Sequence, residues 1–428
     1  MSDRRSRLVS LSGLLLVVAA ALAGGWLVTA AIDLPTAPED YNLVQWEVRH
    51  LPNKWLYRVG TLLRGGPDET EKTRRVERFL ALNAQIASLE GQAGSPQGSD
   101  SSVGESAGVS GELPALRRER DGLRNSVEAV LEQRVSGVAE EAGLESSFPF
   151  FPGARWLFPP VDFEFAEPPN VLAISPRDRI YLESTRLLKS DLTLEEIEKV
   201  EGYWEAKGVS ALVVGVAGVG TYPSAVPPEA DYSDLLATVA HEWMHQYLFF
   251  RPLGSRYFRN PTIATINETV ADMAGRELGT LVAERYPLSA SPPTAQPSLP
   301  AGQAGPPAGE AGAGATPTPS AGIDFDQVMR NLRRDVDSLL ADGKVTDAES
   351  LMEQTRQFLA AHGYFIRRIN QAYFAFHGLY ADTPASSSPI GPKLEELRQR
   401  SKSLGDFIHT AARITSEADL DRLLASKG

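Results

Sequence analysis

The sequence predicts an α+β domain in which a small sheet is followed by a mainly helical part. Strands are indicated by short stretches rich in β-branched and aromatic residues, namely 161–165, 170–175, 179–184 and 210–220. Helical periodicity dominates after residue 231. We place this domain at residues 148–428, after an apolar segment and a helical hairpin.

The N-terminus carries a segment that is apolar enough to cross a membrane. Residues 8–32 hold no charged side chain, and as a helix they would span about 37 Å, against a hydrocarbon core of about 30 Å. Arg4, Arg5 and Arg7 precede the segment, so the positive-inside rule leaves residues 1–7 in the cytoplasm. We therefore expect a single-pass protein of the cell membrane whose remaining part is extracytoplasmic.

Two other interpretations of this segment stay open. Thr29, Ala30 and Ala31 resemble the small-residue cleavage site of a secretory signal peptide. A buried core helix is the third alternative. A retained anchor is preferred because the apolar stretch is longer than the hydrophobic region of a typical signal peptide.

Two further regions separate the apolar segment from the domain. Residues 33–69 form a juxtamembrane segment whose Trp46, Trp55 and Tyr57 suit either the lipid interface or packing on the domain. Residues 70–135 read as a helical hairpin, and the Gly/Ser-rich stretch 91–112 as its disordered tip. We expect the hairpin to serve as a spacer or contact surface.

Helix patterns account for most of the domain. An amphipathic helix is predicted at 192–208, with Thr193 as its N-cap. Residues 287–322 are rich in Pro, Ala and Gly and are predicted to be a disordered insertion. The other predicted helices cover 231–250, 262–286, 324–341, 346–378, 393–405 and 416–426.

Composition excludes several classes of function. The chain of 428 residues has a net charge of −13 and no dense basic cluster outside the extreme N-terminus, so we expect no nucleic-acid partner. It contains no cysteine, which excludes disulfides, thiolate metal sites and cysteine nucleophiles. Any metal site must therefore use His, Asp and Glu.

The pattern HExxH at residues 241–245 predicts a metal site. His241 and His245 are four residues apart on an expected helix, so both imidazoles can reach one ion. Glu242 would lie beside that ion without binding it, and could accept a proton from a metal-bound water. Because the helix is largely apolar, two solvated surface histidines are the weaker interpretation. Zinc, at one ion per chain, suits a site of nitrogen and oxygen donors.

A third ligand is expected downstream. The spacing of the metzincin motif fails, because Leu248 and Arg251 stand where a Gly and a His are needed. Glu268 lies in the next predicted helix and can close the tetrahedron. Asp272, four residues later, can orient a ligand imidazole, form an ordinary salt bridge, or replace Glu268 as the ligand.

At these residues the chain resembles the gluzincins. HEWMH (241–245) followed by INETVAD (266–272) is similar to HExxH followed by NExxxD in thermolysin-like zinc peptidases. The resemblance implies a zincin-like fold, zinc on His241, His245 and Glu268, Glu242 as general base, and supporting roles for Asp272 and Asn267. It also implies that the strand before the metal helix pairs with substrate. Residues 369–380 are similar to a segment of membrane-anchored bacterial proteins predicted to be aminopeptidases.

A donor for the developing oxyanion is also needed for such a reaction. Gluzincins take a Tyr or His from the C-terminal helical part, which makes Tyr373, His377 and Tyr380 candidates here. Their spacing of four and three residues would put them on one helix face. The alternative is that they are core aromatics whose polar atoms are satisfied.

The leading hypothesis is therefore a membrane-anchored zinc metallopeptidase that hydrolyses peptide or protein substrates, with aminopeptidase action as one form of this activity. A second hypothesis is a catalytically silent membrane scaffold or regulatory protein that retains the zincin fold. A zinc hydrolase of a non-peptide substrate is the third. The presence of Glu242 favours hydrolysis, because a purely structural zinc site does not need that carboxylate.

Overall fold

The computed structural model describes residues 37–42, 46, 67–94, 103–147, 155–228, 231–289, 323–381 and 383–425. The expected tail 1–7 and span 8–32 lie outside these residues, as do most of the juxtamembrane segment 33–69 and of the insertion 287–322. Within the described ranges, no helix combines the length and the apolar character needed to cross a bilayer. The described fold is mixed, with a small sheet and mostly helices.

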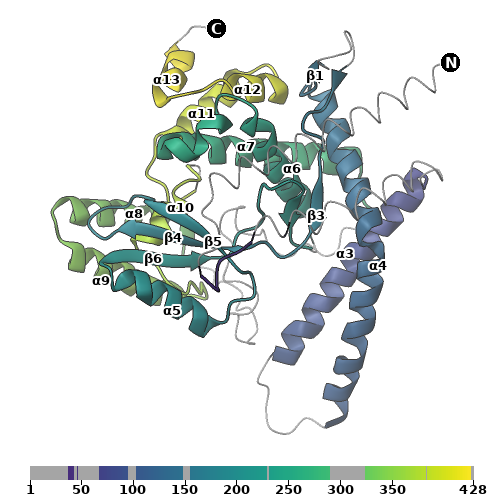
Figure 1. Cartoon of the computed structure of the whole chain (residues 1–428), viewed down its shortest axis with the longest axis horizontal. Coiled ribbons are helices and arrows are strands. Elements are labelled where there is room, and N and C mark those ends of the chain that lie inside the picture. Colours follow the sequence, from purple (N-terminus) through teal and green to yellow (C-terminus); the bar gives the residue numbers. More distant parts are fainter. Residues whose placement is uncertain are drawn as a thin grey trace.

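A three-stranded antiparallel sheet forms one layer (Figure 1). Its order is β5 (Ser184–Leu188), β4 (Asn170–Pro176), β6 (Val209–Val214). Alternate residues of β4 point to opposite faces, as strand geometry requires. Leu172 packs toward α5 (Leu194–Glu205). Ala173 packs toward the opposite side, where α8 (Phe325–Ala341), α9 (Val345–Ala361) and α10 (Gln371–His377) lie. Both faces of this sheet are therefore covered by helices.

The strand predictions were correct at β4 and imprecise around it. The strand expected at 179–184 is wrong in position, because the turn after β4 is longer than expected. The Ser175 hydroxyl donates to Arg179 O and accepts from Tyr181 N, at 3.3 and 3.2 Å, which holds that turn together. The strand expected at 210–220 ends at Val214, where a glycine-rich stretch follows.

Two smaller strand pairs complete the β structure. The short β7 (Ser224–Val226) pairs in parallel with β3 (Phe163–Phe165), and β1 (Ser146–Ser147) pairs with β2 (Arg155–Trp156). β3 lies within the predicted strand 161–165, whereas β1, β2 and β7 were not predicted.

The metal-site residues lie on two long helices. α6 (Tyr232–Phe249) is capped by Asp231, whose carboxylate accepts from the backbone N–H of Ser233 at 2.8 Å. α7 (Pro261–Arg285) is capped by Asn260 and has proline in its first turn, where no N–H donor is needed. The 3-10 helix η1 (Gly254–Arg259) joins them.

The C-terminal helices are shorter than predicted. The single helix expected at 346–378 is wrong: α9 (Val345–Ala361) ends before Gly363, whose φ of 89° is left-handed. A separate α10 (Gln371–His377) then begins at an Asn370 cap. The remaining helices are α8 (Phe325–Ala341), α11 (Ile390–Arg400), α12 (Leu404–Ala411) and α13 (Glu417–Ala425).

The expected hairpin is formed by α3 (Glu69–Gly94) and α4 (Val103–Glu141), which project from the rest of the molecule (Figure 1). Arg78 binds Glu119 across the pair at 2.7 Å. The helices extend into the predicted tip 91–112 from both sides, because Gly and Ser lower helix propensity without stopping a helix. The base of the hairpin shares a core with α6 and α7, so it is more than a spacer.

Candidate metal site

Helices α6 and α7 approach each other closely because glycine stands at their contact. A Cβ atom added at Gly279 would lie 2.7 Å from Ala237 N, and one at Gly275 would lie 2.9 Å from the Cβ of His241. Neither contact is possible for a real side chain without a shift of the helices. The two glycines thus allow ligands from two helices to meet.

The side chains of His241, His245 and Glu268 converge at this contact. Their ligand atoms all lie within 4.8 Å of one another, and the group could hold a metal ion. The Nε2 atoms of His241 and His245 are 3.0 Å apart. Glu268 Oε2 lies 3.3 Å from Nε2 of His245 and 3.8 Å from Nε2 of His241. The alternative in which Asp272 replaces Glu268 as ligand is not favoured, because the converging group contains Glu268.

Two neighbours hold these ligands in place. Asn267 Oδ1 lies 2.8 Å from His245 Nδ1, so Nδ1 can donate to it and Nε2 keeps its lone pair for a metal. The hydroxyl of Tyr257, on η1, donates to Glu268 Oε1 and leaves Oε2 for the histidines. The resemblance predicted a supporting role for Asn267. The role of Tyr257 was not predicted, because its only signal in the sequence is its position between the two ligand helices.

The charges of the site compensate each other. Burial alone would lower the pKa of His245, but the Glu268 carboxylate outweighs it and raises this pKa to about 9. Burial would raise the pKa of Glu268, whereas the positive charge of His245 lowers it to about 2. Without a metal, His245 is therefore protonated and Glu268 is ionised near neutral pH.

Glu242 is buried beside the ligands and against a glycine-rich segment. Burial raises its pKa to about 7, with His245 opposing this shift and Glu268 adding to it. A Cβ atom at Gly218 would lie 2.7 Å from Glu242 Cδ, and one at Gly220 would lie 3.0 Å from His245 Cβ. The backbone at 218–220 therefore packs directly on the Glu242 side chain. The strand predicted at 210–220 includes these glycines, whereas in the structure they follow its end at Val214.

Helix α6, which carries His241 and His245, also binds the segment that follows Gly218 and Gly220. Gln246 Nε2 donates to Thr221 O and, at 2.7 Å, to Ser224 Oγ. Val219 N and Ala225 O are 3.1 Å apart, so the chain folds back on itself just after Gly218. These bonds fix the position of the glycine backbone against Glu242.

Asp272 lies one turn beyond Glu268 on α7 and is 1% exposed. Arg276, four residues later, binds its carboxylate, which corresponds to the salt-bridge interpretation of this residue. Gly275 places this part of α7 against His241, so Asp272 is also near the ligand helix.

Of the three candidate donors, Tyr380 lies at the site. Its ring centroid is 6.3 Å from that of His241, and burial together with the charges of Glu268 and other site groups raises its pKa. Its hydroxyl therefore stays protonated and can donate. Tyr373 belongs to the core on the sheet, and the His377 ring lies 4.3 Å from the Tyr373 ring.

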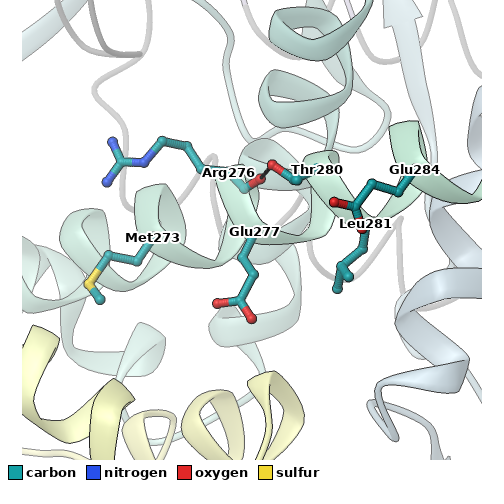
Figure 2. Close-up of a pocket in the computed structure, with 6 residues that line it drawn as sticks. All are labelled: Met273, Arg276, Glu277, Thr280, Leu281 and Glu284. Carbon is teal, nitrogen blue, oxygen red and sulfur yellow. Dashed lines mark hydrogen bonds between the residues drawn. The ribbon is translucent and has the colours of Figure 1, made fainter. Parts of the chain in front are cut away.

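A pocket of about 380 Å³ lies elsewhere, along α7 (Figure 2). It contains none of the converging ligands, so it is distinct from the metal site. Its lining comprises Met273, Arg276, Glu277, Thr280, Leu281 and Glu284.

Comparison with known proteins gives no relative: no family model, no curated protein and no solved structure matches the chain.

Asn267→Ala is expected to weaken zinc binding about 10–100-fold, because His245 loses the partner that orients its ring. Zinc affinity would be measured by competition with a fluorescent chelator. Thr280→Ala, an exposed change on the same helix, is the matched control and should leave the affinity unchanged. Equal affinities of the two variants would contradict the role of Asn267.

Zinc binding is expected to strengthen as pH rises. The pKa of His245 in the metal-free protein is raised to about 9, so below that pH a proton competes with the metal. Displacing one proton predicts a gain in affinity of about tenfold per pH unit between about pH 6 and 8. Competition titrations across this range would check it, and a flat profile would show that His245 is already neutral there.

Proposed function

We propose that this chain is a zinc metallopeptidase of the gluzincin type with a zincin-like fold. The observation that carries the proposal is the convergence of His241, His245 and Glu268 around one point, with Glu242 buried beside them. Two imidazoles and a carboxylate are a donor set typical of catalytic zinc, and three protein ligands leave a fourth position for water. The chain has no cysteine, so a closed thiolate site is excluded.

Zinc bound to these ligands would supply a Lewis acid that polarises the scissile carbonyl and lowers the pKa of water. Glu242 would accept the proton of the attacking water and pass it to the leaving amine. Its raised pKa of about 7 suits a group that both accepts and returns a proton near neutral pH. Tyr380, protonated and beside His241, would donate to the developing oxyanion.

The proposal extends to location and substrate. The uncharged segment 8–32 would anchor the chain in the cell membrane as a single span, with residues 1–7 cytoplasmic and the metal site outside. The substrate would be a peptide or protein. The resemblance of residues 369–380 to predicted aminopeptidases supports aminopeptidase action as the more specific form of the activity.

Glu242→Gln is expected to retain zinc and to lower peptide hydrolysis by about 10²–10⁴-fold, because the proton acceptor is lost while the ligands remain. Zinc content and turnover of a peptide library would be measured on the same preparations. Glu284→Gln, an exposed change on α7, is the control. Hydrolysis by Glu242→Gln at the wild-type rate would refute the mechanism. Zinc-loaded wild-type protein that cleaves no peptide would instead favour the catalytically silent scaffold.

Gly218→Ala is expected to lower kcat by about 10²-fold with zinc affinity unchanged, because the new methyl group displaces the Glu242 carboxylate but no ligand. Gly202→Ala is the matched control, since a Cβ there has nothing within 4 Å. A kcat equal to that of the control would show that the backbone at Gly218 does not position Glu242.

A further inference from the structure

The N-terminal chain joins the sheet before it reaches the helical hairpin. Tyr41 N donates to Leu187 O at 3.0 Å, and Lys189 N donates to Glu39 O at 2.9 Å. Asp40 adds an ion pair with Arg186 at 3.2 Å. Residues 39–41 therefore cover the outer edge of β5, and they fix where the chain enters the domain.

An aromatic and basic cluster lies at the C-terminal end of α5, where Tyr203 and Lys207 are exposed and Trp204 is half-buried against the core. Tyr203 is 59% exposed, and Lys207 Nζ lies 4.1 Å from its ring centroid and 4.6 Å from that of Trp204. The two aromatic rings meet edge to face at 5.7 Å. We call Tyr203, Trp204 and Lys207 the α5 cluster.

The charge of Arg186, which binds the entering chain at Asp40, also acts on Tyr203 of the α5 cluster. The hydrogen bond and charge of Lys207 lower the pKa of Tyr203, and the charge of Arg186 contributes in the same direction. Arg186 is the residue that binds Asp40. The acidic side chains of the first turns of α5, Glu195 and Glu196, lie at the opposite end of the helix from the cluster.

We propose that the α5 cluster docks on the phospholipid interface of the membrane that holds the N-terminus of this chain. The inference rests on the proposed anchor. If that span ends at residue 32, the five steps to residue 37 cover at most about 17 Å of extended chain, which keeps the β5 edge near the bilayer. Trp, Tyr and Lys are the side chains favoured there, because each combines an apolar body with a polar tip.

This contact would fix the distance between the metal site and the membrane surface. From residues 39–41 the sheet continues through β5 and β4 to β6, so three strand spacings, about 14 Å, separate the point of chain entry from β6. The chain that follows β6 reaches Glu242 through Gly218. The site would then be held within reach of extracytoplasmic segments of substrates that are themselves held at the membrane.

The absence of cysteine allows a single reporter to be placed on the full chain. Ala206→Cys, an exposed position between Trp204 and Lys207, would carry an environment-sensitive fluorophore. Ser255→Cys, exposed on η1, is the matched control. Both labelled proteins would be reconstituted in nanodiscs with and without lipids that carry a nitroxide quencher at headgroup depth.

The expected result is that the label at 206 loses most of its emission with the quencher lipid, whereas the label at 255 keeps it. Adding Tyr203→Ser and Lys207→Glu should restore the emission at 206. Equal quenching at both positions, or no effect of the double change, would overturn the docking. Zinc retention by each variant shows that the fold survives.

A separate measurement distinguishes the failure of the anchor from the failure of the docking. Alkaline carbonate would release the full chain from cell membranes if residues 8–32 do not anchor it. A chain that resists carbonate, yet shows no quenching at 206, would be anchored without the contact.

Discussion

The close approach of α6 and α7 is the constraint on which the rest of the site depends. Two ligands come from one turn of α6, but the third comes from another helix, and it can reach them only if the backbones nearly touch. Gly275 and Gly279 make this possible, since even one methyl group at either position would force the helices apart. The largely apolar packing of both helices then stabilises an arrangement in which the charged or polar side chains of His241, Glu242, Asn267 and Glu268 are buried.

Burying those groups costs free energy unless each has a partner. In this protein the ligands compensate one another, Asn267 pairs with His245 Nδ1, and the Tyr257 hydroxyl donates to Glu268 Oε1. The opposite pKa shifts of His245 and Glu268 express this coupling. A divalent ion would replace the stored proton, so metal binding and the stability of the site are linked.

The sequence predicted the metal site better than the fold around it. Local spacing determines whether His241 and His245 share a helix face, so HExxH could be read without the structure. The N-cap at Thr193 is equally local, and the structure confirms it. Positions that depend on contacts between distant segments were missed: Tyr257 reaches Glu268 across a helix connection, and Gly218 meets Glu242 after the strand has ended. Of the three donor candidates Tyr373, His377 and Tyr380, only the folded chain distinguishes Tyr380.

Zinc content of the purified full chain tests the central claim most directly. After exhaustive buffer exchange, metal analysis should find about one zinc per chain, and none after His245→Ala, because two remaining ligands hold zinc too weakly. Zinc that is absent from the wild-type chain and not regained on titration would contradict the account, since the convergence of His241, His245 and Glu268 would then have no metal to explain it.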